Sequence, residues 1–534
     1  MKKRYIYSCL VLGATLFAGC TKNFDNINTD PNQTTAALIN PNFFMAQAQM
    51  EFANGSSGYR QLLFQSCWIQ GLASTEGYYT NGDKYVYGGS PQTYTNMIWN
   101  DDYSAEGRIY EMKNLIKGNA AYSNLDNCGT ILQVLIQQQI TDQYGDSPYS
   151  QASQAKSGIF TPAFDKTQAI YTNMLSQLAT ATAALDASKP GPTSDLFYKG
   201  NVAQWKKLGY SLMLRLAMRL TKVDAATAQK YAEMAYSGGA MSSAADDAKV
   251  FSDNADNYPN NAANTFLNNV PDWQGVRWGN TLISFMQSNS DPRISAVAEV
   301  AIGNGLTANG LYVPGDNTAS KQVGMPNGYD LGGSHDISTA PGYPGATPAD
   351  PSVSGDAPAE QGKYSRPRFA VYLDRNGSNI VLTYGETELL FAEAASNGWA
   401  TGVAATHYAN ALAADMQALA ELNSTPQAVV DPAAITAYVA AHPLTPATAL
   451  QQINMEYYVQ ACTTFQFIEA WNNWKRSGFP VLTPVVYPGQ FTNGSIPRRV
   501  TYPVSLAQTN PSGLAAAAAD QGADNFMTKV WWDK

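Results

Sequence analysis

WKKLGYSLMLRLAMRL, residues 205–220, carries the most regular helical pattern in this 534-residue chain. Its large apolar side chains recur every three or four residues, so they share one face of a helix. They are Trp205, Leu208, Leu212, Leu216 and Leu220. Arg215 and Arg219 lie on a different face. The stretch therefore predicts a helix that packs on other helices, with arginines that pair with helical carboxylates such as Glu386 and Glu393.

Similar spacing occurs on both sides of this stretch. Shorter helices are predicted over 43–52, 60–70, 131–144, 167–185, 225–236, 382–396, 403–422 and 434–441. Thr167 is predicted to cap one of them. A longer helix is predicted from Leu450 to Trp471 and should end near Gly478, because Pro480 cannot continue it. The chain is therefore expected to be mainly α-helical, with helix pairs that stack like tetratricopeptide repeats, although no strict 34-residue period is visible.

The middle of the chain, from about residue 237 to 381, has few helical patterns. Within it, residues 303–367 are rich in turn-forming pairs such as Pro314-Gly315 and Asn327-Gly328. No charged or Pro/Ser-rich linker divides the chain. We therefore expect a single helical domain over 42–534 that carries a loop-rich, irregular insertion.

The first twenty residues predict export. Three basic residues precede a short apolar run and then small residues that end in Cys20, which is the order of a signal peptide. The run is shorter than the roughly 20 residues that span a bilayer. LFAGC at 16–20 is similar to the processing box of bacterial lipoproteins, whose cysteine receives lipid; an ordinary signal with an incidental cysteine is the alternative. We expect a signal peptide over 1–19 and a lipidated flexible stem over 20–41.

Composition limits the ligand classes. The signal peptide takes three of the 33 basic residues and none of the 42 acidic ones, which leaves a formal net charge of −12 and argues against nucleic-acid binding. Charged residues make up only 14% of the chain, so amide and hydroxyl groups supply most polarity, which suits uncharged ligands. Cys67, Cys128 and Cys462 remain after processing. Three cysteines cannot all be paired in a framework of disulfide bonds, and we favour buried free thiols over a single disulfide bond.

The sequence offers little for catalysis. Its three histidines, His335, His407 and His442, lie far apart, and no zinc-protease, Cys-x-x-Cys, nucleophile-elbow or phosphate-loop motif is present. A pair of catalytic carboxylates, as in a glycoside hydrolase, remains an alternative, because the distance between two such residues in the fold does not follow from their spacing in the sequence. We therefore assign no catalytic residue, metal ligand or cofactor. Structural calcium at the Asp/Asn cluster 253–257 is the alternative, although its spacing is not that of an EF-hand.

Loop-borne aromatic residues are the candidates for ligand binding. Sugar rings present C–H faces that lie on aromatic side chains, and their hydroxyls need amide, carboxylate or guanidinium partners. Such residues occur in one cluster over 78–99, in a second over 273–278, and in the insertion. The candidates are Tyr87, Trp99, Trp273, Arg277, Trp278, Tyr312 and Tyr329. Packing under a loop is the alternative for each.

Seven groups of short motifs follow one another along the chain. They are FDNINTDPN at 24–32, GDSPYSQA at 145–152, the block 195–220 with WKK and LRLAMR, DPR at 291–293, LTY-x-E at 382–386 followed by LFAEA, AW-x-x-WKR-x-G-x-P at 470–480, and IPRR-x-x-YP at 496–503. Each is weak alone, but together they cover most of the chain. In this order they resemble the SusD/RagB family of Bacteroidetes outer-membrane lipoproteins.

The resemblance implies a SusD-like fold of tetratricopeptide-like helix pairs with a less regular lobe. It also implies a lipid anchor in the outer membrane, a body that faces the exterior, and a SusC-like TonB-dependent transporter barrel as partner. Family members bind glycans or peptides and deliver them without catalysis. We therefore expect a cell-surface oligosaccharide-binding protein, with a peptide-binding RagB-type protein, a surface glycoside hydrolase and an adhesin as alternatives. The insertion has no alignable motif, so the resemblance does not name the ligand.

Overall fold

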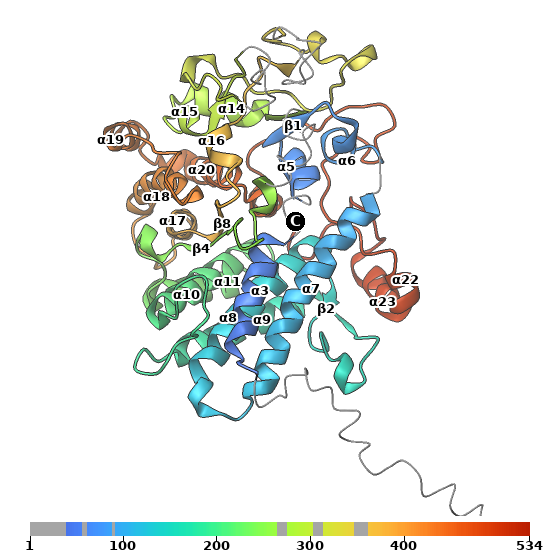
Figure 1. Cartoon of the computed structure of the whole chain (residues 1–534), viewed down its shortest axis with the longest axis vertical. Helices are drawn as coiled ribbons and strands as arrows, with labels where there is room; N and C mark the ends of the chain where they lie inside the picture. The colour runs from blue at the N-terminus through green and yellow to red at the C-terminus, as the bar shows by residue number, and fades with distance from the viewer. Residues whose placement is uncertain (1–38, 56–60, 88–90, 264–274, 303–312, 347–360) are drawn as a thin grey trace, which may run out of the picture. The chain divides into compact units, whose positions relative to one another are not determined.

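Figure 1 presents a computed structural model, which describes residues 39–55, 61–87, 91–263, 275–302, 313–346 and 361–534. Contacts group Asn42–Lys534 into one compact unit and Met1–Pro41 into another, and the fold below is that of the larger unit. The predicted signal peptide and Cys20 lie outside the described residues. None of the helices in the described ranges is both long and apolar enough to span a membrane.

The N-terminal half of the larger unit is a series of packed helices (Figure 1). The long helices are α3 (Asn42–Asn54), α7 (Pro91–Ile116), α8 (Ser123–Tyr144), α9 (Thr167–Ala184), α10 (Val202–Arg219) and α11 (Ala225–Gly238). Helix α3 packs on α7, and from α7 to α11 each helix packs on the next. Because neighbours in sequence are neighbours in space, short connections suffice to build this layer.

The C-terminal half continues the same pattern. Its helices are α17 (Tyr384–Ser396), α18 (Ala404–Ala418), α19 (Pro432–Ala441), α20 (Ala449–Thr463) and α21 (Phe467–Ser477). Helix α17 packs on α18 and α20, and it also contacts α10, which joins the two halves. Strands β4 (Ala248–Phe251) and β8 (Ser378–Leu382) pair antiparallel at this junction. The mainly helical fold with packed helix pairs is therefore confirmed.

Helix α10 contains the stretch quoted first and confirms the helix predicted there. Asn201 caps its start by accepting hydrogen bonds from the backbone N–H groups of Ala203 (3.1 Å) and Gln204 (3.3 Å). All five large apolar residues of its stripe are buried. Burial of a side chain of that size contributes about 1.5–3 kcal/mol, so the stripe fixes α10 in the core.

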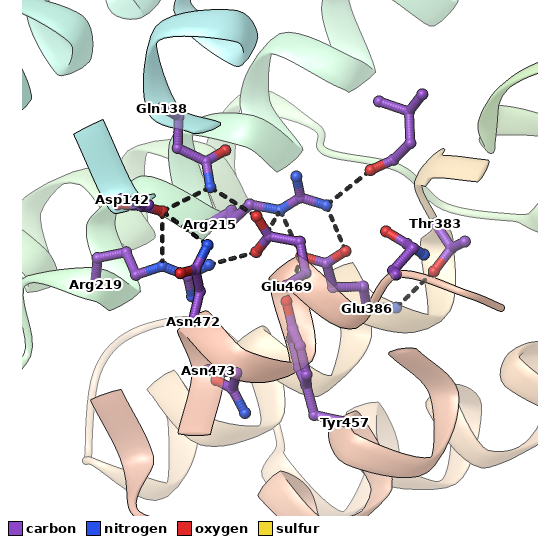
Figure 2. Close-up of polar contacts among 12 residues, drawn as sticks. Gln138, Asp142, Arg215, Arg219, Thr383, Glu386, Tyr457, Glu469, Asn472 and Asn473 are labelled. Carbon is purple, nitrogen blue, oxygen red and sulfur yellow. Dashed lines mark hydrogen bonds and ion pairs between the residues drawn. The ribbon is translucent and has the colours of Figure 1, made fainter. Parts of the chain in front are cut away.

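Arg215 and Arg219 are also buried, and both are paired (Figure 2). Arg215 donates two hydrogen bonds of 2.6 Å to the carboxylate of Glu386 on α17. Arg219 lies 3.3 Å from Asp142 on α8 and pairs with Glu469 on α21. These contacts join three helices to α10 and confirm the predicted interhelical ion pairing. Loss of one partner from such a buried pair costs about 3–5 kcal/mol, because the other charge stays behind uncompensated.

Other charged residues of the motifs are paired in the interior too. Glu393 on α17 accepts a 2.7 Å hydrogen bond from Arg476 on α21. Arg499 donates to the carbonyl oxygen of Tyr144, the last residue of α8, at 2.9 Å. Trp471 of α21 is fully buried. The motifs at 382–394, 470–480 and 496–503 therefore serve packing, as predicted.

One predicted helix is wrong as a single unit. The span from Leu450 to Trp471 contains α20 and α21, separated around Phe465, whose positive φ of 58° cannot continue a helix. The ring of Phe465 stacks on Tyr372 with centroids 4.3 Å apart, so the break places an aromatic side chain in the junction. The predicted end is confirmed, because Gly478 adopts a left-handed φ of 86° directly after α21.

Two further elements differ from prediction. Thr167 is the first residue of α9 and not its cap; a carboxylate oxygen of Asp146 accepts the hydrogen bond from its backbone N–H at 2.8 Å instead. Residues 91–116 form the 26-residue helix α7, where loop-borne aromatics were expected. Tyr94 and Trp99 therefore lie on a helix.

The middle region is irregular, as predicted, and apart from strands β4 and β8 its described residues form further short elements. They are η5 (Ala244–Asp246), β5 (Val276–Trp278), α14 (Asn280–Ser288), α15 (Ile294–Val297), β6 (Ala298–Glu299), η6 (Ala319–Lys321), η7 (Gly333–His335), η8 (Ile337–Thr339), β7 (Arg366–Pro367) and α16 (Phe369–Tyr372). Strand β5 pairs antiparallel with β1 (Leu72–Ser74), and β6 pairs antiparallel with β7. A small apolar cluster of its own anchors this region; it consists of Ala73, Met325, Ile337, Ala340 and Tyr364.

Further elements connect the larger helices or, in the case of α22 and α23, follow the last of them. They are α5 (Gln65–Trp68), η2 (Gly77–Tyr79), α6 (Thr80–Asp83), η3 (Ala120–Tyr122), β2 (Ser147–Pro148), η4 (Ala155–Ser157), β3 (Phe164–Asp165), η10 (Leu419–Leu422), η11 (Pro446–Thr448), α22 (Leu506–Thr509) and α23 (Pro511–Gln521). Cys67, Cys128 and Cys462 are buried free thiols, which confirms the favoured alternative. Burial raises the pKa of all three thiols, so their reactive thiolate form is disfavoured.

Candidate ligand-binding site

Four segments that are far apart in the sequence enclose a hollow of about 490 Å³, which we call the loop pocket. Its lining includes Asn280 and Thr281 of α14 and Gln70, which follows α5; both helices are labelled in Figure 1. Its lining residues are Gln70, Asn280, Thr281, Pro326, Asn327, Gly328, Tyr329, His335, Pro341, Thr483, Pro484, Val485 and Val486. Its size falls within the range of ordinary small-molecule sites, so it can hold a sugar unit or two.

The lining of the loop pocket combines flat and apolar groups with uncharged polar ones. Tyr329 and His335 provide rings, and five proline and valine side chains provide apolar wall. Gln70, Asn280 and Thr483 belong to the amide and hydroxyl groups among them. The lining contains no Asp, Glu, Lys or Arg. This chemistry suits an uncharged ligand with C–H faces and many hydroxyl or amide groups.

A glycine allows two walls of the loop pocket to approach each other. Gly328 has a positive φ of 89°, and a Cβ at that position would lie 2.6 Å from a methyl carbon of Val485. Any other residue would therefore clash with the opposite wall and strain the backbone. The Asn327-Gly328 pair predicted as a turn thus brings the 326–329 segment against the 483–486 segment.

Asp83 fixes the turn at 327–328 through hydrogen bonds to its carboxylate. One of its carboxylate oxygens accepts a hydrogen bond from the Asn327 side-chain amide (2.7 Å), and the other accepts from the backbone N–H of Gly328 (2.9 Å). Ser74 donates a third, at 3.1 Å. Burial raises the pKa of Asp83, while Lys84 and these hydrogen bonds oppose the rise. The residue anchors the loop to the end of α6 and to β1.

Gln70 links three segments at another side of the loop pocket. Its backbone has a positive φ of 54°. Its side-chain N–H donates to the carbonyl oxygen of Thr483 (2.6 Å), and its side-chain oxygen accepts from the hydroxyl of Thr281 (2.8 Å). Tyr458 on α20 donates to its backbone carbonyl at 3.0 Å. The helical scaffold thereby positions the pocket wall directly.

One predicted site residue lines the loop pocket, and a second packs on the segment that follows one of its walls. Tyr329 lines it and is half-buried. Tyr87 has 57% of its surface exposed, and its ring packs on Phe491 with centroids 4.6 Å apart. Phe491 follows the 483–486 wall by five residues and donates its backbone N–H to the carbonyl of Tyr85 at 2.8 Å. The segment 483–491 therefore connects the pocket to the exposed face of Tyr87.

Three other predicted site residues are packed in the interior. Trp99 packs on Tyr144 in an edge-to-face contact, at a centroid distance of 5.1 Å. Trp278 has no exposed surface and donates its indole N–H to the carbonyl of Val297 at 3.1 Å. Arg277 is also fully buried. We leave these three out of the site proposed below. Trp273, Tyr312 and Cys20 lie outside the described residues.

The structure adds residues that sequence reasoning missed. Gln70, Asn280, His335 and Thr483 line the loop pocket. The turn at 327–328 was visible as a turn signal, but nothing in the sequence pairs it with the segment 483–486, which lies more than 150 residues away. Among the described residues, no group of three or more His, Cys, Asp or Glu side chains is placed to hold a metal ion.

A second hollow, of about 550 Å³, lies at the turn between α7 and α8. Its lining comes from residues 110–133 alone, with Tyr110 as its one aromatic residue. Lys113 in it already pairs with Asp126 at 3.0 Å. The loop pocket is the stronger candidate, because it unites four segments and includes a predicted aromatic residue.

Comparisons with known proteins agree with the resemblance in the motifs. Residues 31–503 match the sequence profile of the SusD-like family, which is described as starch-binding and associating with the outer membrane. No curated protein sequence matches the chain.

Solved structures of similar fold include proteins that bind chitin. One is a chitin-binding protein with 27% identity and a TM-score of 0.77, covering 93% of this chain and 100% of its own. A chitin-binding SusD homolog from Flavobacterium johnsoniae has 23% identity and a TM-score of 0.70, covering 92% and 98%. The Bacteroidetes SusD-like protein AC2a has 22% identity and a TM-score of 0.75, covering 93% and 100%. Since the family profile covers most of the chain and the whole fold has solved counterparts, the protein belongs to the SusD-like family, whose members bind nutrients at the outer membrane without catalysis.

Proposed function

We propose that the protein captures an uncharged oligosaccharide in the loop pocket and delivers it to a SusC-like TonB-dependent transporter. The observation that carries this proposal is the uncharged lining of the pocket, in which the ring of Tyr329 lies among amide and hydroxyl groups. A sugar ring needs both kinds of group at once. For a longer chain the proposal includes the exposed ring of Tyr87, which packs on Phe491, five residues beyond the 483–486 wall.

Chitin oligosaccharides are the ligand class that we propose first. Support comes from the chitin-binding protein that is 27% identical over 93% of this chain. The chemistry is compatible, because each N-acetylglucosamine unit adds an amide N–H and C=O to the ring. The side-chain amides of Gln70, Asn280 and Asn327 belong to the pocket lining. Those of Gln70 and Asn327 already donate hydrogen bonds within the protein, but an amide carbonyl oxygen accepts two hydrogen bonds, so these groups supply acceptors for the ligand.

The location belongs to the same proposal. Lipid on Cys20 would hold the body at the outer membrane, facing the exterior, through the stem 20–41. A Cys20→Ala variant should lose the incorporation of labelled fatty acid and appear in the soluble fraction. If Cys20→Ala still carries lipid, the anchor is elsewhere. Co-purification of a large barrel protein with the membrane-bound form, and not with the Cys20→Ala form, would support the transporter partner.

Binding is tested by titration calorimetry on residues 21–534 with the hexamers of N-acetylglucosamine, maltose-type glucan and cellulose-type glucan. We expect the chitin hexamer to bind most tightly. Tyr329→Ala and Tyr87→Ala should each weaken binding about tenfold, which corresponds to about 1.4 kcal/mol. Tyr258→Ala is the matched control, since Tyr258 is 56% exposed but does not line the pocket. Unchanged affinity in both site variants would refute the pocket, and tighter binding of another hexamer would refute chitin.

A further inference from the structure

A buried lysine lies behind the loop pocket. Lys84 follows α6 directly and has no exposed surface. Its ammonium lies 3.7 Å from a carboxylate oxygen of Asp83 and 3.6 Å from one of Asp330, and it donates to the carbonyl of Ser74 at 3.3 Å. The ring of Tyr487 is 6.0 Å from the same nitrogen, within reach of a cation–π contact. A charge removed from water in this way has to be compensated by its neighbours.

The two outer partners of Lys84 belong to opposite walls of the loop pocket. Asp330 follows the lining residue Tyr329, and Tyr487 follows the lining residue Val486. The Tyr487 hydroxyl donates to the Asp330 carboxylate at 2.6 Å, and this hydrogen bond is the main cause that raises the pKa of Tyr487 to about 12. The hydroxyl therefore remains a donor at physiological pH.

Asp330 is held in its loop by backbone contacts as well. Its N–H donates to the carbonyl of His335, and its carbonyl accepts from the N–H of Ile337, both at 2.8 Å. The ring of His335, which lines the pocket, packs on Tyr487 with centroids 4.8 Å apart. The chain Lys84–Asp330–Tyr487 therefore runs from the scaffold, through one wall, to the other.

We propose that Lys84 is a positioning residue that holds the two walls of the loop pocket in their binding arrangement, by neutralising Asp330 and so fixing the hydrogen bond from Tyr487. This inference rests on the proposed function for its effect on ligand binding. Without the ammonium, two carboxylates within 4 Å of one point would lack their shared counter-charge, and like charges repel. The mobile element would be the 330–337 loop, since Asp83 is fixed by three hydrogen bonds.

The first experiment uses Lys84→Met, which keeps an unbranched chain and removes the charge. Titration with the N-acetylglucosamine hexamer should give about tenfold weaker binding. Adding Asp330→Asn should recover at least threefold of that loss, because asparagine removes the unpaired charge and keeps an acceptor for Tyr487. Recovery of this kind is specific to positioning through Asp330. Wild-type affinity in Lys84→Met, or a further loss in the double variant, would overturn the proposal.

The second experiment needs no ligand. Hydrogen exchange in Lys84→Met should be at least fivefold faster at amides of 326–341 and 483–491, with α10 unchanged. Lys249→Met is the control, since it also removes a lysine that pairs with a carboxylate, that of Glu421 at 2.6 Å, but away from the pocket lining. Equal exchange in Lys84→Met and wild type would refute the positioning role, even if the protein binds no hexamer and the proposed function fails.

A third variant covers a folding failure. If Lys84→Met does not fold, Tyr487→Phe removes only the hydroxyl that joins the two walls. Tyr487→Phe should speed hydrogen exchange at 326–341 and 483–491 about threefold, and it should weaken binding of the N-acetylglucosamine hexamer by a similar factor. No change in either measurement would then overturn the proposal.

Discussion

Glu106 offers a test of the buried polar interior through pH. It lies on α7 with 1% of its surface exposed, and the side-chain amide of Gln137 approaches it only to 3.5 Å. Burial raises its pKa from 4.5 to about 8, against a hydrogen bond from Gln133. The folded protein therefore holds this carboxyl protonated at neutral pH, whereas the unfolded chain does not.

The sign and size follow from linkage. Between pH 4.5 and 8 the folded state binds one proton that the unfolded state releases, so Glu106 lowers stability progressively as the pH rises through this window. The change amounts to about 3 kcal/mol between pH 4.5 and 7. Glu106→Gln has the same shape and cannot ionise. Between pH 4.5 and 7 the free energy of unfolding of Glu106→Gln should therefore rise by about 3 kcal/mol relative to that of the wild type.

The assay is urea unfolding of residues 21–534 at pH 4.5, 5.5, 6.5 and 7, followed by tryptophan fluorescence. The difference in unfolding free energy between Glu106→Gln and wild type should grow steadily with pH. Glu111→Gln is the control on the same helix, because Glu111 is 30% exposed and pairs with a lysine that is 77% exposed. A difference that stays constant within about 0.5 kcal/mol over this range would refute an elevated pKa, since a raised pKa demands a slope.

Three more substitutions follow from the structure. Arg215→Met should lower the unfolding free energy by about 3–5 kcal/mol in urea, because it leaves the carboxylate of Glu386 buried without its cation. Burial lowers the pKa of Lys475 from 10.5 to about 7, so between these two pH values the unfolded chain binds a proton that the folded protein lacks. The free energy of unfolding of the wild type should therefore rise by about 2 kcal/mol between pH 7 and 9, relative to that of Lys475→Met. Gly328→Ala should weaken hexamer binding at least tenfold by calorimetry, because its Cβ would collide with the facing wall, whereas Gly489→Ala, with positive φ but open space, should not.

Helices with a regular apolar stripe were predictable from the sequence, and their ends less so. Helix α10 follows its stripe because the same residues are both spaced for a helix and buried. The break at Phe465 was not predictable, since the apolar spacing continues through it from Ile453 to Trp471. Periodicity shows which residues share a face of a helix. It does not reveal a single residue with non-helical backbone angles when the apolar spacing continues in the next helix.

Helix α7 escaped prediction for a related reason. Its first half, from Pro91 to Tyr103, mixes Thr, Asn, Asp and Tyr, which are all common in loops. Packing against α3 and α8 keeps it helical. Propensity is a weak guide where tertiary contacts decide, so Trp99 was placed in a loop although it packs in the core.

The candidate site was predictable only in part, because it forms from partners that the sequence does not connect. The turn at 327–328 and the aromatic Tyr329 were visible as local features. Their burial against residues 70, 281 and 483 depends on the whole helical scaffold. Trp278 looked like a loop aromatic for the same reason, although strand pairing with Leu72 and a hydrogen bond to Val297 place it inside.

The distribution of charge explains why a protein of this kind can combine a firm scaffold with an adaptable ligand surface. Arg215, Arg219, Arg293 and Arg366 are fully buried and paired with carboxylates, so ion pairs tie helices, and at β6 and β7 two short strands, together in the interior. The loop pocket, in contrast, is lined by uncharged groups only. An uncharged lining needs no fixed counter-charge, so substitutions in the loops of the proposed site can change its ligand preference without breaking an ion pair. Lys84 is a charged residue next to the pocket, but it does not line it. Its ammonium contacts Asp330 and the ring of Tyr487, which belong to the segments that form the two walls.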